Sequence, residues 1–162
     1  MQKPIFKNLL QVGIVVDDLD KYLKKYYDEY GIGPWVILDF NKDTVKNMTI
    51  KGKRVDYAMR LATCDFNGIQ WELIQPLDDK CVYYDFLKTH GPGIHHVALG
   101  IDNYDDVVKF LADKGIHELQ GGNYMGLQYT YFDLTDELAL IGEIYNGEVV
   151  MPEDAPTYPP KC

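Results

Sequence analysis

The chain of 162 residues has few cysteines, a deficit of positive charge and no long apolar run. Its three cysteines, Cys64, Cys81 and Cys162, form no CxxC pair. They therefore favour reduced thiols over a disulfide framework or a zinc site. The most apolar stretch near the start, residues 9–16, is too short for a signal peptide or membrane span and is interrupted by a glutamine and a glycine. We expect a soluble, cytoplasmic protein with no membrane partner.

The net charge of −9 argues against a nucleic-acid partner, because neutralising phosphates requires a basic surface. Residues 41–60 depart from this balance, since they carry a net charge of +4 while the rest of the chain carries −13. A solvated loop is the commoner explanation of such a run. The functional alternative is a binding site that includes Lys51 and Arg54. It would bind a carboxylate, a phosphate or the nucleotide of a thioester substrate.

An internal repeat organises the chain. Residues 11–20 align with residues 96–105, and each copy has the pattern of a strand followed by an Asp or Asn that can cap a helix. Each half then runs through a helix to a Gly-Ile pair and ends on a strand with one glutamate among apolar neighbours. The repeat predicts two βαβββ modules that pack together, because neither can cover its own sheet.

The length and the hydrophobic content of 46% fit a single globular domain spanning residues 1–162. We expect the first module over residues 5–77, a connector over 78–93, the second module over 94–147 and an irregular proline-rich tail over 148–162. Within these ranges the sequence predicts helices over 18–30, 83–87 and 103–115, strands over 35–38, 54–64, 69–74, 128–132 and 138–145, a hairpin turn at Asn67-Gly68, and a loop over 121–123.

Two adjacent histidines, His95 and His96, follow a Gly-Pro-Gly turn at the start of the second module. Side chains alternate between the two faces of a strand, so the two imidazoles are expected to point in opposite directions. His96 shares its face with the small residues Ala98 and Gly100, which leave room for a ligand. His95 lies with a row of apolar residues and is expected to pack on the helix-covered side.

The repeat places four polar residues at equivalent strand positions. A polar side chain buried without a partner costs a few kcal/mol, and two carboxylates that face one interior repel each other. A buried polar network with basic partners is one solution. A divalent cation is the other, and the mixed nitrogen and oxygen donors suit zinc, cobalt, manganese or nickel. We favour the cation, with four candidate ligands: Gln11, Glu72, His96 and Glu143.

These segments resemble the vicinal oxygen chelate superfamily, which includes glyoxalase I, methylmalonyl-CoA epimerase, extradiol dioxygenases and bleomycin-resistance proteins. The resemblance covers about residues 5–147 and rests on the motifs QVGIVVDDLDK, GIGPW, WELIQPLDD, YDFLKTHGPGIHHVALGID and GEIYN. The epimerase branch is the most similar. The resemblance implies an α+β fold in which two βαβββ modules curl into a half-barrel with the helices outside. It also implies a homodimer and one divalent metal held by the four residues above, although the epimerases usually have histidine where this chain has Gln11.

The reaction implied by the resemblance is removal of a proton next to a carbonyl through a metal-stabilised enolate, by an epimerase or racemase. Glu143 and Asp56 are the candidate proton-transfer residues. Lys51, Arg54 and Trp35 are candidate substrate-binding residues. The candidate substrates are an acyl-CoA or another carbon acid, and an aromatic carbon acid is included among them. A lactoylglutathione lyase of the glyoxalase I type is one alternative, and a small-molecule binding or resistance protein without chemistry is another.

Overall fold

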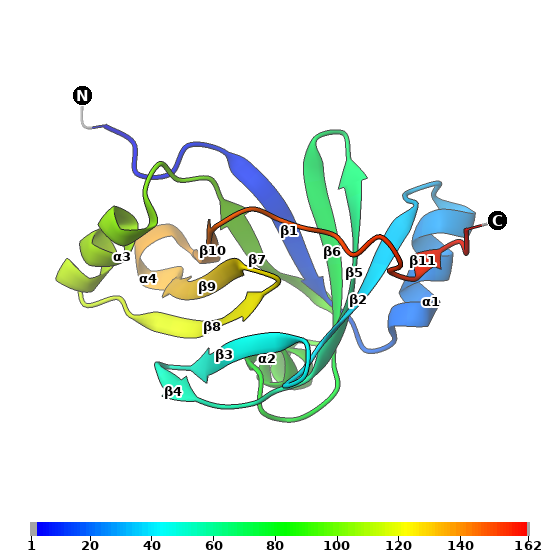
Figure 1. Ribbon diagram of the computed structural model, residues 1–162, viewed down its shortest axis with the longest axis horizontal. Coiled ribbons are helices and arrows are strands. Elements are labelled where there is room, and N and C mark those ends of the chain that lie inside the picture. The colour runs from blue at the N-terminus through cyan, green and yellow to red at the C-terminus, as the bar shows by residue number, and fades with distance from the viewer. Residues whose placement is uncertain (1–2, 162) are drawn as a thin grey trace.

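The structure is a computed structural model that describes residues 3–161 and is built on one curled, open sheet (Figure 1). The helices are α1 (Leu19–Lys24), its π-helical continuation η1 (Lys25–Glu29), α2 (Val82–His90), α3 (Tyr104–Asp113) and α4 (Thr135–Leu138). The strands are β1 (Leu9–Val15), β2 (Trp35–Phe40), β3 (Val45–Ile50), β4 (Lys53–Arg54), β5 (Met59–Phe66), β6 (Ile69–Pro76), β7 (Gly93–Leu99), β8 (Glu118–Tyr124), β9 (Leu127–Leu134), β10 (Leu140–Asn146) and β11 (Thr157–Tyr158).

The strand order shows the repeat directly. Within the described residues it is β11-β2-β5-β6-β1-β7-β10-β9-β8-β3-β4. Each half begins with a central strand, β1 or β7, which pairs in parallel with the last strand of its own half, β6 or β10. The two central strands pair with each other in antiparallel fashion and join the halves. The predicted α+β fold of two βαβββ modules in a half-barrel is confirmed.

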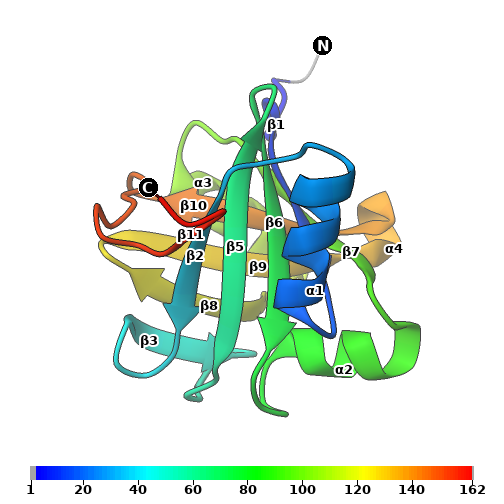
Figure 2. The same ribbon diagram turned by 90° about the vertical axis from the view of Figure 1, so that its right-hand side faces the viewer.

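Helices α1 and α3 cover the outer side of the sheet, and Figure 2 shows α1 beside β6. Helix α2 instead packs through Tyr83 against the inner cluster that contains Tyr131, so the expectation that all helices lie outside does not hold for α2. The predicted caps at the two helix starts are confirmed, because the side chains of Asp18 and Asn103 accept hydrogen bonds from the amides of Lys21 and Asp106. Apolar residues of α1 pack on the first module, and Val107 and Leu111 of α3 pack on the second. The inner side of the sheet therefore remains for the site.

Four segments differ from the sequence prediction. The tail expected to be irregular over 148–162 contains β11, which pairs with β2. The strand expected over 138–145 begins at Leu140, because α4 extends to Leu138. The residues expected as a loop over 121–123 lie within β8, because the two glycines there pair with β9 as strand residues. The basic segment forms the β3–β4 hairpin, and β3 leaves the first module to pair with β8 of the second. The following strand accordingly begins at Met59 instead of residue 54.

The Asn67-Gly68 turn joins β5 to β6 as predicted, with φ values of 55° and 88° that match the left-handed conformations of a tight hairpin. Cys64 and Cys81 are buried free thiols, whereas Cys162 lies outside the described residues. Among residues 3–161, no helix is long and apolar enough to cross a membrane. The cytoplasmic location and the homodimer remain predictions.

Candidate metal centre and cavity

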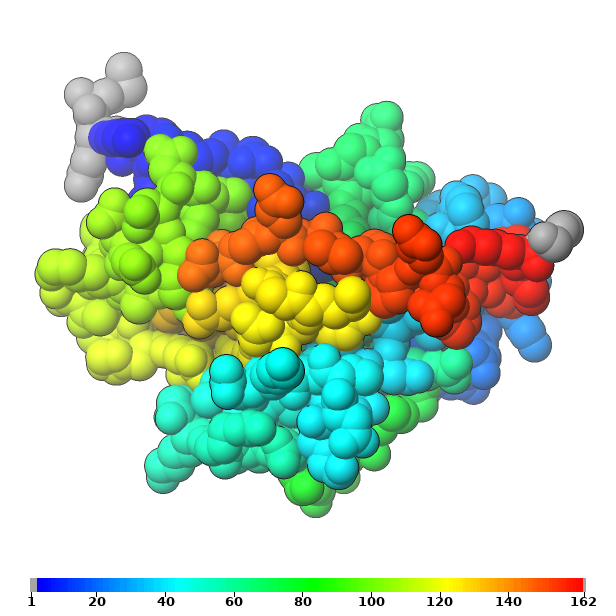
Figure 3. Space-filling view, viewed as in Figure 1, coloured from blue at the N-terminus to red at the C-terminus, as the bar shows by residue number. Residues whose placement is uncertain are grey.

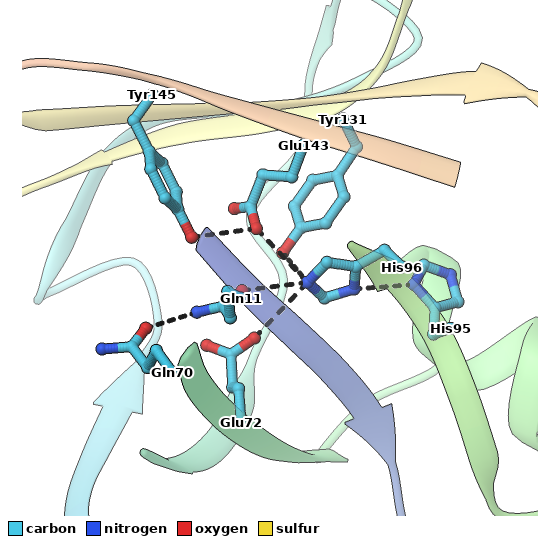
Figure 4. Close-up of polar contacts among 8 residues, drawn as sticks. All are labelled: Gln11, Gln70, Glu72, His95, His96, Tyr131, Glu143 and Tyr145. Carbon is cyan, nitrogen blue, oxygen red and sulfur yellow. Dashed lines mark hydrogen bonds and ion pairs between the residues drawn. The ribbon is translucent and has the colours of Figure 1, made fainter. Parts of the chain in front are cut away.

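The four predicted ligands converge on the inner side of the half-barrel, where β1, β6, β7 and β10 meet (Figure 4). The Nε2 atom of His96 lies 3.2 Å from Oε1 of Gln11, 3.2 Å from Oε2 of Glu143 and 3.5 Å from Oε2 of Glu72. All four side chains are buried, with exposed fractions of 7% or less.

The strand register explains why these side chains can meet. Gly13 on β1 lies between Glu72 on β6 and His96 on β7, so the imidazole crosses a position that has no side chain. A Cβ at Gly13 would overlap the His96 ring. Ala98 on β7 lies in the same way between Gln11 and Glu143. Each of the two rows has a small residue at its centre over which two longer side chains extend.

A β-bulge changes the expected orientation of His95. Gly13 pairs with His96 while the next residue of β1, Ile14, pairs with Ile94, which leaves His95 as the extra residue. The alternation of faces is therefore broken, and the prediction that the two rings point apart is wrong. Nδ1 of His95 lies 3.1 Å from Nδ1 of His96. One nitrogen must donate and the other accept, so His95 orients the ring of His96.

Further side chains hold the donors in place (Figure 4). The Tyr145 hydroxyl donates to Oε2 of Glu143 over 3.1 Å, and the amide of Gln11 donates to Oε1 of Gln70 over 2.6 Å. The second contact directs the amide oxygen of Gln11 toward His96. The hydroxyl of Tyr131 lies 3.5 Å from Nε2 of His96.

The electrostatics of the metal-free site reflect close packing of charge. Burial lowers the pKa of His96, but its close contacts with the Glu143 and Glu72 carboxyl groups outweigh burial and raise that pKa to about 9. Burial raises the pKa of the Glu72 carboxyl, and the contact with His96 offsets part of this rise. Burial and the charge on His96 lower the pKa of His95 to about 3. Without a metal, a protonated His96 is thus the cation that balances the carboxylates.

The donor chemistry fits a divalent cation. Oε2 of Glu72 is buried and accepts no hydrogen bond among the described residues. The atoms within 3.2–3.5 Å of Nε2 of His96 include two carboxylate oxygens and an amide oxygen, and with the imidazole nitrogen they form a donor set that zinc, cobalt, manganese or nickel would accept. The side chains nevertheless bond to one another, and among residues 3–161 no group of three or more His, Cys, Asp or Glu is spaced to hold an ion. Metal binding would therefore replace the proton of His96 and separate the donors slightly.

A cavity of about 50 Å³ lies in front of three of these donors, Gln11, Glu72 and Glu143. The other polar lining residues are Thr63 and Gln70, apart from the tyrosine hydroxyls. The remaining wall is aliphatic and aromatic, and part of it comes from the segment after β10. These lining residues are Leu38, Phe40, Met59, Leu61, Tyr124, Leu127, Tyr129, Tyr131, Tyr145, Val149, Val150 and Met151.

The other predicted site residues lie away from this cavity. Asp56 is half exposed and pairs with Arg54 over 2.8 Å. Arg54 also donates to the carbonyl of Met48, and Lys51 is exposed in the turn between β3 and β4. Trp35 is fully buried under α1 and η1 on the outer side of the sheet, where its Nε1 donates to the carbonyl of Ile32.

Sequence reasoning missed the tyrosines and the C-terminal segment as parts of the site. The alternation in β9 and β10 carries a usable signal, because Tyr129, Tyr131, Glu143 and Tyr145 occupy alternate positions in their strands. The segment over 149–151 carries no such signal, since it has no regular structure and its place depends on where β11 is anchored.

Comparisons with known proteins agree with this architecture. The methylmalonyl-CoA epimerase of Mycobacterium tuberculosis has a TM-score of 0.65 at 21% identity, over 92% of this chain and 93% of that one. A variant of the Streptomyces coelicolor methylmalonyl-CoA epimerase, in complex with 2-nitronate-propionyl-CoA, has a TM-score of 0.68 at 22% identity, over 91% and 99%. A hypothetical protein of Bacillus halodurans has a TM-score of 0.67 at 17% identity, over 90% and 98%.

Comparison of the amino-acid sequence with known proteins identifies a relative and a matching family model. The relative, hemolysin VllY of Vibrio vulnificus, is 28% identical over 93 residues, which is 57% of this chain and 24% of that protein. The chain thus matches about a quarter of the length of that relative. The family model matches residues 10–132, a range that contains three of the four converging residues and the whole connection between the modules. The chain therefore belongs to the glyoxalase/bleomycin resistance protein/dioxygenase superfamily.

Proposed function

We propose that this protein is a divalent-metal-dependent enzyme that removes a proton next to a carbonyl group, as an epimerase or racemase of a carbon acid. The observation that carries the proposal is the convergence of two carboxylates, an amide oxygen and an imidazole at the floor of an apolar cavity. An apolar surrounding strengthens the electrostatic interactions that stabilise an enolate. The similarity in fold to methylmalonyl-CoA epimerases supports this class of reaction.

In this proposal Gln11, Glu72, His96 and Glu143 hold the ion, and His95 fixes the ring of His96. The bound cation would supply Lewis acidity toward the oxygen on which enolate charge develops. The two carboxylates balance its charge, which gives a reason for their burial in one small volume. Zinc, cobalt, manganese and nickel all accept such a set of nitrogen and oxygen donors.

Proton transfer is assigned to Glu143. This carboxylate lines the cavity, and the hydroxyl of Tyr145 donates to its Oε2 atom. The hydrogen bond fixes the orientation of the carboxylate, as a general base requires. Asp56, the second candidate from the sequence, is paired with Arg54 and does not line the cavity. It therefore offers a matched acidic control outside the site.

The metal part of the proposal is tested on protein purified without chelator. We expect about one divalent ion per chain in the parent and in Asp56→Asn, and a clear loss of metal in Glu143→Gln and His96→Ala. Metal content that is the same in all four proteins would refute the ligand assignment.

The reaction is tested by solvent exchange, followed by proton NMR in deuterated water, with propionyl-CoA, phenylpyruvate and 2-oxobutanoate as probes. We expect enzyme-catalysed exchange next to the carbonyl of at least one probe. Exchange should fall about 100-fold or more in Glu143→Gln and stay unchanged in Asp56→Asn. Binding without any exchange would favour the non-catalytic class, and conversion of a thiol adduct to a hydroxythioester would favour the lyase.

A further inference from the structure

The segment that follows β10 forms one wall of the cavity. This segment, residues 147–156, is called the strap below. It runs from the end of β10 to β11 beside β2, across the open side of the half-barrel (Figure 1). Its atoms form a continuous orange-to-red band across one face in Figure 3. Val149, Val150 and Met151 from the strap line the same cavity as Glu72 and Glu143.

The strap is fixed at its two ends. At Gly147 the chain has a φ of 107°, and a Cβ there would lie 2.7 Å from the carbonyl oxygen of Gly126. At the other end the carbonyl of Pro156 accepts a hydrogen bond from the amide of Ile37, and β11 pairs with β2. Among the described residues, the backbone hydrogen bonds of the strap lie toward its carboxyl end. Its middle part is held by apolar contacts. This part can therefore move without breaking the backbone hydrogen bonds of a β-strand pair.

The cavity wall is aromatic and has no basic side chain among its lining residues. Phe40 and Tyr124 stack with a centroid distance of 4.4 Å, and Tyr129 lies 5.8 Å from Phe40. Three cations of the basic segment have carboxylate partners of this chain, with Lys42 bound to Asp43, Arg54 to Asp56 and Arg60 to Asp39. The other three, Lys46, Lys51 and Lys53, are exposed on β3, β4 and their turn and do not line the cavity. The wall thus offers stacking surface to a ring and no partner to a nucleotide phosphate.

We infer that the substrate of the proposed reaction is a compact carbon acid with an aromatic ring, enclosed by the strap, and that it carries no coenzyme A. The inference rests on the proposed function and adds the class of substrate to it. The ring lies against the tyrosine and phenylalanine wall, and the carbonyl end faces Gln11, Glu72 and Glu143. A cavity of about 50 Å³ is smaller than the roughly 150 Å³ that encloses benzene, so the strap must move outward when the ring enters.

The test measures binding and needs no turnover. Benzoylformate has a ring and two vicinal oxygens but no proton next to its carbonyl, so it binds without reacting. Isothermal titration calorimetry compares it with 2-oxobutanoate, which lacks the ring, and with propionyl-CoA, using metal-loaded and metal-free protein. We expect benzoylformate to bind the loaded protein at least tenfold more tightly than either. Equal or tighter binding of propionyl-CoA, or no preference for the ring, would overturn the inference.

Variants locate the ring. Tyr124→Ala should weaken benzoylformate binding about two- to tenfold and leave 2-oxobutanoate unchanged, while Tyr124→Phe retains the affinity. Met151→Ala should weaken benzoylformate binding in the same range, whereas Glu153→Ala, at an exposed strap position, should have no effect. Equal effects of Met151→Ala and Glu153→Ala would contradict the role of the strap. A chain that ends at Gly147, checked for a cooperative thermal transition, should lose the preference for the ring.

Failure of the inference and failure of the proposed function give different results. If benzoylformate binds as expected and no probe exchanges its proton, the proposed reaction is wrong and the aromatic site stands. If propionyl-CoA exchanges its proton and benzoylformate shows no preference, the reaction stands and the inference is overturned.

Discussion

The position of the His96 ring over Gly13 makes Gly13→Ala the most direct test of the site geometry. Gly13 has no positive φ, so alanine fits its backbone and the substitution adds only a methyl group. That methyl group would occupy the space of the imidazole. Gly13 also lies between the strands that carry Glu72 and His96, so no neighbouring strand can move away without disturbing a donor.

The expected cost follows from overpacking. An added methyl group in a closely packed site typically costs about 1–3 kcal/mol in the free energy of unfolding. For a chain of this length, each kcal/mol lowers the melting temperature by about 2–4 °C. We therefore expect a fall of about 2–12 °C. If the ring instead rotates away, stability is retained and the nitrogen donor is lost, which should lower metal affinity by about tenfold or more.

The assay combines calorimetry of the metal-free protein with a competition titration of metal against a chelator. Gly142→Ala is the matched control, since this strand glycine is next to Glu143 and its added Cβ would meet only leucine methyl groups, the nearest being Cδ1 of Leu134 at 2.9 Å. The control should lose some stability and keep its metal affinity. If Gly13→Ala changes neither quantity, the ring does not lie across β1 and the geometry of the site is wrong.

The remaining predictions concern pH and packing. The pKa of His96 is about 9 in the folded protein and near 6.5 in the unfolded chain. Protonated His96 therefore stabilises the metal-free protein fully below pH 6.5, and up to about 3 kcal/mol of the free energy of unfolding is lost as the pH rises to 9. The pH dependence contributed by His95 has the opposite sign, because its pKa in the folded protein is lowered to about 3. The free energy of unfolding therefore falls as the pH drops below 6.5. Urea unfolding across pH should therefore show a maximum near pH 6.5, with the alkaline decline absent in His96→Gln; a decline that survives this change would refute the assignment. Trp35→Phe should cost about 1–3 kcal/mol through the lost hydrogen bond to Ile32 and leave metal content and benzoylformate affinity unchanged, whereas selective loss of ligand binding would restore Trp35 as a substrate contact.

Much of the fold was predictable because the repeat makes each half a check on the other. The caps at Asp18 and Asn103, the turn at Asn67-Gly68 and the two closing strands all follow from local rules that tertiary contacts did not override. The four donors were found because equivalent positions in the two halves have polar residues in otherwise apolar strands.

The misses share a different physical cause. Strand alternation predicted that His95 and His96 point apart, but the period of two does not encode the one-residue bulge that brings the rings together. The predicted packing of His95 against a helix is found, since its ring contacts Tyr83 and Phe86 of α2. The basic segment looked like a solvated loop, and its pairing with β8 depends on a contact far along the chain. Trp35 is a large aromatic residue of the kind that often lines a binding site. Its side chain faces the outer side of the sheet, however, where it packs under a helix.

The pairing of β3 with β8 has a consequence for how the chain folds. A second half produced alone would leave β8 as an open edge, with its amides and carbonyls free to pair with another molecule. The first half, in turn, would carry a hairpin with no strand beside it. The two halves share a sequence pattern, but we expect that neither folds as a separate unit. Co-expression of the two halves should therefore recover solubility that neither half has when it is produced alone.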